Sequence, residues 1–216
     1  MKKKLFLTIS AIGLCLWLSP LNTCAQSTDI PKYEVAAEFS SLTLNIAHTE
    51  PGLGARFTYN LNKHVALEAA GYFFPHECQF CSTGRITEGL FGVKAGKRFQ
   101  KWGIFGKARP GLVSLSKGSF TLVPIGGGGP FPFTVESRRL TNFALDVGGV
   151  VEFYPSRRIV TRFDFGDTMV RFGRRTTGFQ LITDPITGVT TLGAPIISPA
   201  YTGHTFQFTA GVGLRF

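Results

Sequence analysis

Apolar and polar residues alternate in steps of two along the last thirteen residues of the chain, HTFQFTAGVGLRF. One face of this segment carries Phe206, Phe208, Val212, Leu214 and Phe216, and the other carries threonine, glutamine, glycine and arginine. Strict alternation over this length indicates a β-strand with one apolar and one polar side. The segment is about twice as long as an ordinary strand, and a strand of this length can cross a bilayer at a tilt.

The same alternation recurs in eight segments of the chain. They lie at 33–45, 52–61, 64–74, 85–99, 102–115, 139–154, 158–171 and 203–216. Tight turns at 61–63, 100–101 and 155–157 alternate with longer links near 46–51, 75–84, 116–138 and 172–202. Short connections at one end and long ones at the other predict an all-β fold, an eight-stranded antiparallel up-and-down barrel. The short turns are expected on the periplasmic side and the long loops outside the cell.

The charged residues of these segments share one face, opposite a face of Val, Leu, Phe, Ala and Gly. Seven acids and seven bases lie on it: Glu34, Glu38, Arg56, Glu68, Glu88, Lys94, Arg98, Lys107, Arg109, Asp146, Glu152, Arg162, Asp164 and Arg215. A soluble, lipocalin-like barrel would turn the apolar face inward, whereas a transmembrane barrel turns it to lipid. The segregated loops and the aromatic residues near the strand ends favour the transmembrane form.

Eight strands enclose a lumen that side chains fill, so charges inside it need partners. Asp146 is expected beside Arg109, and Lys94, Lys107 or Arg109 beside Glu88. The predicted network along the barrel axis comprises Glu68, Glu88, Lys94, Lys107, Arg109, Asp146, Arg162 and Asp164. Such a lumen indicates a closed barrel, and a narrow or gated porin-like channel is the alternative.

The first 25 residues have the pattern of a secretory signal peptide. Three lysines precede an apolar run from Leu5 to Leu18, and small residues then lead to Ala25. A lipoprotein acylated at Cys24 is the competing interpretation, but Asn22 and Thr23 are poor residues before a lipidated cysteine. Cleavage after Ala25 would leave a barrel domain at 26–216 in the bacterial outer membrane.

The chain resembles the OmpA-like family of small eight-stranded outer-membrane barrels, in its single-domain form. The resemblance rests on YNLNKHVALEAAGYF, FGVKAGKRFQKWGIFGKARPGL, DVGGVVEFYPSRRIVTRFDFGDTMVRF and the terminal strand, which cover most of residues 33–216. It implies an architecture and not a ligand, since such proteins include adhesins, complement-evasion proteins, structural barrels and a few lipid enzymes. It also implies that Phe216 is part of the signal that the barrel-assembly machinery reads.

Catalytic chemistry is not indicated by the sequence. An outer-membrane lipid enzyme needs a serine and a histidine side by side, but His48, His64, His76 and His204 are scattered and none is paired with a serine. The glycine run at 126–129 lacks the Lys-Ser/Thr pair of a phosphate loop, and its apolar neighbours could extend two strands above the membrane. We expect a non-enzymatic protein without a cofactor, contributing to envelope integrity or surface interaction.

The positive charge of the chain lies outside the lumen. The formal net charge of +10 falls to +7 without the three leader lysines, and the paired lumen contributes none. Bidentate arginines suit lipopolysaccharide phosphates, and an exported barrel meets no nucleic acid. The expected partners are outer-membrane lipids, lipopolysaccharide and the assembly machinery. The arginines that gather at the outer rim are Arg138, Arg139, Arg171, Arg174 and Arg175.

Cys78 and Cys81 are the cysteines that follow the leader, in the motif HECQFC beside His76. A zinc site usually needs four ligands, and a thioredoxin-type pair needs a helix N-terminus. The pattern therefore favours a disulfide within the second long loop of an exported protein, and no metal.

If Cys78 and Cys81 form this disulfide, the unfolded and unreduced mature protein should take up almost no thiol reagent. Reduction before labelling should then expose two thiols per chain, counted by mass spectrometry. Full labelling without a reductant would show free thiols and would reopen the metal-binding interpretation.

Overall fold

The computed structural model describes residues 30–45, 48–75, 84–124 and 133–216. The expected signal peptide, His76, Cys78, Cys81 and the glycine run at 126–129 lie outside the described residues. Within the described ranges, no helix is long and apolar enough to span a membrane.

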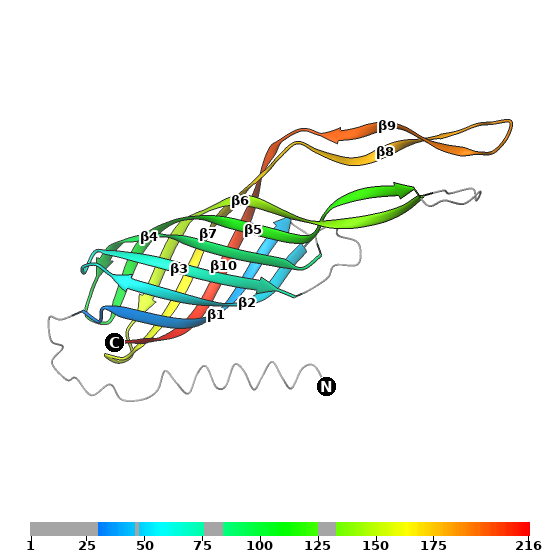
Figure 1. Ribbon diagram of the computed structural model, residues 1–216. Helices are drawn as coiled ribbons and strands as arrows, with labels where there is room; N and C mark the ends of the chain where they lie inside the picture. The colour runs from blue at the N-terminus through cyan, green and yellow to red at the C-terminus, as the bar shows by residue number, and fades with distance from the viewer. Residues whose placement is uncertain (1–29, 46–47, 76–83, 125–132) are drawn as a thin grey trace, which may run out of the picture.

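Eight strands close into one antiparallel barrel, in the order β1-β10-β7-β6-β5-β4-β3-β2, and β8 pairs with β9 as a separate two-stranded sheet (Figure 1). Every neighbouring pair is antiparallel. The strands are β1 (Tyr33–Asn45), β2 (His48–Asn60), β3 (Val65–Phe74), β4 (Ile86–Arg98), β5 (Trp102–Pro124), β6 (Phe133–Phe153), β7 (Ile159–Phe172), β8 (Arg175–Thr183), β9 (Thr190–Ser198) and β10 (Tyr201–Arg215).

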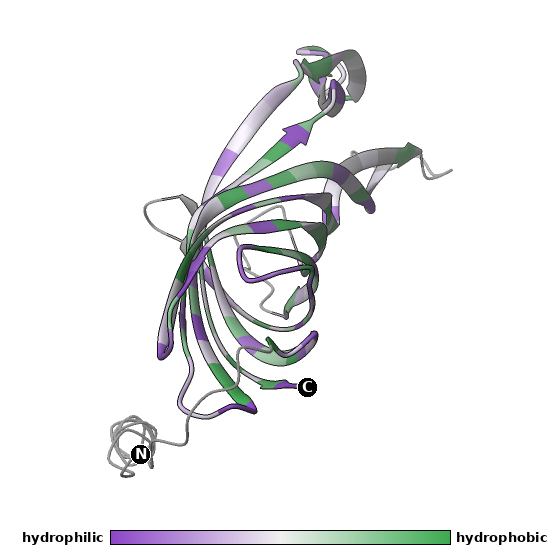
Figure 2. Ribbon diagram, turned by 90° about the vertical axis from the view of Figure 1, so that its left-hand side faces the viewer, coloured by the Kyte–Doolittle hydropathy of each residue, from purple (hydrophilic) through white to green (hydrophobic). Residues whose placement is uncertain are grey.

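Alternation along the barrel strands sends apolar side chains outward and polar side chains inward. In β10, Phe206 and Val212 are exposed on the wall, whereas Thr205, Gln207 and Thr209 are buried in the lumen. Figure 2 shows the same alternation of hydrophobic and hydrophilic residues along other strands. A charged interior inside an apolar wall is the arrangement of a transmembrane barrel, and the reverse of a lipocalin-like one. The predicted fold class is confirmed, and the soluble alternative is wrong.

The tight turns lie at the predicted places and are held by short side chains. Asn62 Oδ1 accepts hydrogen bonds from the backbone N–H groups of His64 and Val65, at 2.7 and 2.9 Å. Ser156 Oγ likewise accepts a hydrogen bond from the backbone N–H of Arg158, at 3.3 Å. Asparagine and serine favour such turns because their side chains hydrogen-bond to nearby backbone.

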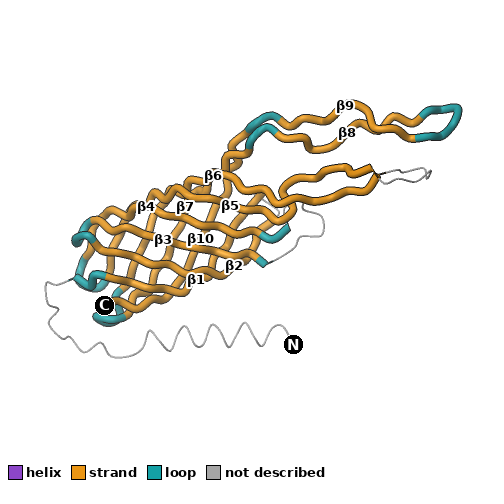
Figure 3. Tube along the Cα trace, in the orientation of Figure 1, coloured by secondary structure: helices purple, strands orange, loops and turns teal. Residues whose placement is uncertain are grey.

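The outer end of the barrel contains more strand than the sequence predicted. β2 begins at His48, within a predicted link, and β5 and β6 continue through much of the segment expected as a loop at 116–138. The predicted link at 172–202 holds the hairpin of β8 and β9. Figures 1 and 3 show that β5, β6 and this hairpin project well beyond the barrel wall.

The β8–β9 hairpin turns at the sequence DPITG. Asp184 Oδ1 accepts a hydrogen bond from the Ile186 backbone N–H at 2.8 Å, and hydrogen bonds from this N–H group and from Thr187 lower the pKa of the Asp184 carboxyl. Gly188 closes the turn with φ = 68°, in the left-handed region that favours glycine. This turn is local, which explains how a hairpin can form away from the barrel.

The barrel is closed by pairing of its first and last strands. Backbone hydrogen bonds join Tyr33 N–H to Phe216 O at 2.8 Å and Phe216 N–H to Tyr33 O at 2.9 Å. The two rings lie 6.1 Å apart on the outside of the seam. Phe216 therefore supplies the last backbone pair of the seam and an apolar side chain on the lipid-facing wall.

Deleting Phe216 should lower the amount of folded, heat-modifiable protein in the outer membrane. The deletion removes the final pair of the closing strand and leaves the backbone groups of Tyr33 unpaired at a wall surrounded by lipid. The variant Phe216→Tyr, which keeps an aromatic ring and the backbone pair, is the matched control. Normal levels of folded protein after the deletion would contradict this role.

Candidate functional site: the barrel lumen

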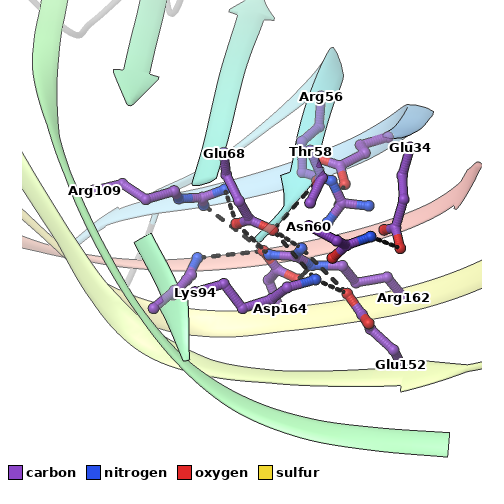
Figure 4. Close-up of polar contacts among 12 residues, drawn as sticks. Glu34, Arg56, Thr58, Asn60, Glu68, Lys94, Arg109, Glu152, Arg162 and Asp164 are labelled. Atoms are coloured by element: carbon purple, nitrogen blue, oxygen red, sulfur yellow. Dashed lines mark hydrogen bonds and ion pairs between the residues drawn. The ribbon is translucent and has the colours of Figure 1, made fainter. Parts of the chain in front are cut away.

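The lumen collects charged side chains from all eight barrel strands. All fourteen charged residues that the sequence placed on the polar face point inward. Arg109, Asp146, Glu152 and Lys94 have no solvent exposure. Figure 4 shows several of these side chains converging from opposite walls, with hydrogen bonds and ion pairs between them.

Arg162 from β7 is the centre of this cluster (Figure 4). Its Nη2 lies 2.9 Å from Glu68 Oε2 and 2.8 Å from Asp164 Oδ2. Its Nη1 and Nε groups make second contacts to the same two carboxylates, so both pairs are bidentate. Lys94 contacts Glu152 and lies 3.5 Å from Glu68. Bidentate, fully buried pairs of this kind are among the strongest hydrogen-bonded ion pairs.

A second group joins this centre from β5 and β6. Arg109 donates from Nε to Asp146 Oδ2 at 2.8 Å, and its Nη2 lies 2.6 Å from the same oxygen. Lys107 Nζ lies 2.9 Å from Asp146 and 3.5 Å from Asp164. Arg109 Nη1 lies 3.8 Å from Glu68, which connects the two groups. Asp146 thus lies beside Arg109, as the sequence predicted.

A third group lies where the strands reach the tight turns. Glu34 accepts a hydrogen bond from Asn60 at 2.9 Å and faces Arg98 and Arg215, each at 3.4 Å. The Tyr154 hydroxyl accepts from Arg98 at 2.9 Å and donates to Glu152 at 2.8 Å. This tyrosine therefore links the turn end of the lumen to the central cluster.

Glu88 has a hydrogen-bond partner that the sequence did not predict. The register of β3, β4 and β5 places it opposite Tyr72 and Val113, and its hydrogen-bond donor is Gln207 Nε2 at 2.9 Å. Lys94 lies six residues further along β4, directly opposite Lys107. Alternation gives the face on which a residue lies but not its height. Arg109 and Lys107 interact electrostatically with Glu88, as expected, whereas Gln207 was not foreseen as its hydrogen-bond donor.

The outer part of the lumen contains an apolar cluster, which was not predicted from the sequence. Inward-facing side chains pack there into one buried cluster: Leu42, Ala70, Tyr72, Phe74, Ile86, Leu90, Val113, Leu115, Ala144 and Val170. A signal was present, since the inward positions become apolar near the outer ends of several strands. Glu50, assigned to a link, also lies buried on the inward face of β2.

The predicted rim arginines do not share one environment. Arg138, Arg139, Arg171 and Arg174 are exposed. Arg175 is half-buried, donates to the Gly118 carbonyl at 3.0 Å and lies over the Phe172 ring at 5.2 Å. Arg175 is therefore occupied in joining the base of the hairpin to β5.

On the outward face near the outer rim, the carboxylate of Asp167 is paired with the His204 side chain. His204 Nδ1 lies 2.6 Å from Asp167 Oδ2, and Asp167 Oδ1 accepts the Thr205 backbone N–H at 3.1 Å. His64 lies at a tight turn, with Nδ1 2.9 Å from the Gly96 carbonyl. In the part of the chain that the structure describes, no cluster of three or more histidines, cysteines and carboxylates could hold a metal.

Solved structures of small barrels resemble this chain. Neisserial surface protein A aligns over 86% of this chain and 97% of its own, with 13% identity and a TM-score of 0.49. The N-terminal barrel of Pseudomonas aeruginosa OprF aligns over 85% and 97%, with 11% identity and a TM-score of 0.43. The attachment invasion locus protein Ail of Yersinia pestis, in complex with the heparin analogue sucrose octasulfate, aligns over 85% and 96%, with 13% identity and a TM-score of 0.44.

No protein-family model matches the chain, and no curated protein matches its sequence. The resemblance to small eight-stranded outer-membrane barrels, expected from the sequence, is thus found among solved structures. The fold itself is established by the strand pairing described above.

Replacing Arg109 with alanine should lower the free energy of unfolding by about 3–5 kcal/mol, because Asp146 would lose its closest partner in a buried site. Replacing the exposed Arg174 with alanine should change it by less than about 0.5 kcal/mol. Urea unfolding of the refolded barrel in lipid vesicles, followed by tryptophan fluorescence, measures both. Equal effects of the two changes would contradict a stabilising network.

Proposed function

We propose that this protein is a non-enzymatic outer-membrane barrel with a closed lumen, contributing to envelope integrity or to surface interaction through its outer loops. The observation that carries the proposal is the set of buried charged and apolar side chains along the lumen. Ion pairs occupy it from the tight turns to Glu38 and Arg56, which lie 3.3 Å apart. The apolar cluster lies in the outer part, together with the buried Glu50 and Glu88.

The lumen has two layers, the ion-paired layer next to the tight turns and the outer layer that holds the apolar cluster. They oppose conduction for different physical reasons. An ion in the charged part of the lumen would have to displace bidentate pairs such as Arg162 with Glu68 and Asp164. These side chains are buried, so no solvent is present to replace the contacts that they would lose. An ion in the outer lumen would lose hydration against the apolar Phe74, Ile86 and Leu115, with Glu50, Glu88 and Asn142 as the buried polar groups beside them. Each layer alone would resist passage.

The projecting ends of β5 and β6 and the β8–β9 hairpin support a role in surface interaction. The hairpin exposes Leu181, Ile182, Val189 and Ile196, and Ile186 at its tip is 92% exposed. Apolar side chains displayed this far from the barrel wall are suited to contact with another surface.

The remaining parts of the proposal concern the envelope. The leader at 1–25 would direct export and be cleaved after Ala25, and Phe216 would serve recognition by the barrel-assembly machinery. Exposed Arg138, Arg139, Arg171 and Arg174 would contact lipopolysaccharide phosphates at the outer rim. Arg175 is set aside from this group, because its guanidinium is engaged with Gly118 and Phe172.

The refolded mature protein should give no steady ion-conducting openings in planar lipid bilayers, because both layers of the lumen exclude hydrated ions. An open porin treated in the same way is the positive control. Large, steady openings of the wild-type protein would overturn the closed lumen and favour the porin-like channel.

A further inference from the structure

The end of the barrel that carries the tight turns exposes basic side chains and no acidic ones. Its acids, Glu34 and Glu152, are buried in the lumen. Within the described ranges, no exposed aspartate or glutamate lies at this end. Arg157 is exposed there and has a partner of its own. Five further exposed bases form what we call the basic collar: Lys32, Lys63, Lys97, Lys101 and Arg158.

The basic collar is spread around the barrel. Lys32 precedes β1, Lys63 lies between β2 and β3, and Arg158 lies between β6 and β7. Lys97 and Lys101 flank the turn between β4 and β5. Because the strands follow one another in the order β1-β10-β7-β6-β5-β4-β3-β2, these places lie at intervals along the whole circumference. Figure 3 shows the tight turns together at the end opposite the projecting β8 and β9.

Strand pairing fixes the level of the collar along the barrel axis. The backbone carbonyl groups of Lys32, Lys101 and Arg158 each accept a hydrogen bond of 2.9 Å from a backbone N–H of a neighbouring segment. The donors are, in the same order, Asn60, Tyr154 and Arg215. The height of these bases is therefore set by the fold.

Aromatic side chains of the wall lie directly beside the collar. Lys97 Nζ lies 5.4 Å from the centroid of the Phe99 ring, and Lys32 Nζ lies 5.9 Å from that of Tyr59. Phe99 in turn stacks on Trp102, with 4.2 Å between the ring centroids. Aromatic residues near the strand ends of a transmembrane barrel mark the interface between the apolar core and the headgroups. The collar therefore lies at the level of the headgroups.

We propose that the basic collar binds the phosphodiester headgroups of anionic phospholipids in the leaflet at the turn end. The inference rests on the proposed membrane function, in whose orientation this is the periplasmic leaflet. Bases distributed around the circumference suit the lipids that surround the barrel better than one compact ligand. A lysine or arginine near an anionic lipid surface strengthens the attraction by about 1 kcal/mol, or about fivefold.

The outer end differs from the turn end in its exposed charges. Exposed arginines there are accompanied by the exposed carboxylates of Glu136 on β6 and Asp184 in the β8–β9 turn. At the turn end, exposed carboxylate side chains do not oppose the attraction of the collar for anionic headgroups. The uniform charge of the collar thus supports a lipid preference at this end.

The test uses Trp102, which lies beside the collar and is the one tryptophan of residues 26–216. The mature protein is refolded in phosphatidylcholine vesicles that contain a minor fraction of a lipid brominated in its acyl chains. Quenching of Trp102 fluorescence then reports how often the brominated lipid lies beside it. Brominated phosphatidylglycerol should bind there about fivefold more tightly than brominated phosphatidylcholine at low ionic strength. Added salt should reduce this preference, because it screens exposed charges.

Matched variants separate the collar from the net charge of the chain. Lys97→Gln/Lys101→Gln removes the two bases nearest to Trp102 and should abolish the preference. Arg171→Gln/Arg174→Gln removes the same charge at the outer rim and should leave the preference as in wild type. Heat-modifiability on gels confirms that each variant has folded.

A second reporter tests whether the collar extends beyond this turn. Tyr59→Trp in a Trp102→Phe background places the fluorophore beside Lys32 and should show the same preference for phosphatidylglycerol. Adding Lys32→Gln should remove the preference at this reporter.

Equal quenching by the two brominated lipids at both reporters would overturn the proposal. A preference that persists in Lys97→Gln/Lys101→Gln, or that is lost in Arg171→Gln/Arg174→Gln, would also overturn it. So would binding to purified peptidoglycan that Lys97→Gln/Lys101→Gln abolishes, in the absence of a lipid preference, since the collar would then serve the cell wall. Failure of the closed lumen would be seen separately, as conductance in planar bilayers.

Discussion

The structure depends on one constraint: every charge that the barrel wall encloses must find a partner inside the lumen. The wall faces lipid, and eight strands leave no room for bulk water, so an unpaired charge would carry a large desolvation penalty. Arg162 illustrates the solution, since a single guanidinium spans from β7 to Glu68 on β3 while also holding Asp164. The contacts that stabilise the barrel are therefore cross-lumen contacts as well as strand pairs, and they tie opposite walls together.

The same constraint connects stability with the proposed function. Paired charges occupy the lumen between the tight turns and Glu38, and the apolar residues around Phe74 lie beyond them with Glu50 and Glu88. In the proposed function, this barrel is a closed and stable element of the membrane, and it interacts with its surroundings at the rim and on the projecting strands. The bulge in β5 between Leu115 and Ser119 and the long β8–β9 hairpin are both additions at that outer end. Under this proposal, the barrel is the rigid base and the outer end carries the surfaces for interaction.

Much of the fold followed from alternation alone, because a period of two assigns each residue to the lumen or the wall. Strand register does not follow from alternation, which is why Gln207 was not predicted as the hydrogen-bond donor to Glu88. The β8–β9 hairpin was missed because its threonine-rich strands lack a clear apolar face, although the turn sequence DPITG between them favours a hairpin. The bulge that shifts the pairing of β5 and β6 between Leu115 and Ser119 also could not be predicted from alternation.

The central claim is that the lumen charges stabilise the barrel as partners and not as separate polar groups. A double-mutant cycle on Arg162→Met and Glu68→Gln tests this most directly, with the free energy of unfolding measured by urea titration of the protein refolded in vesicles. Each single change leaves a buried charge without its counter-charge, whereas the double change removes one positive and one negative charge together. The account predicts that the double variant is destabilised by clearly less than the sum of the two single variants. Simple additivity of the two effects would contradict it.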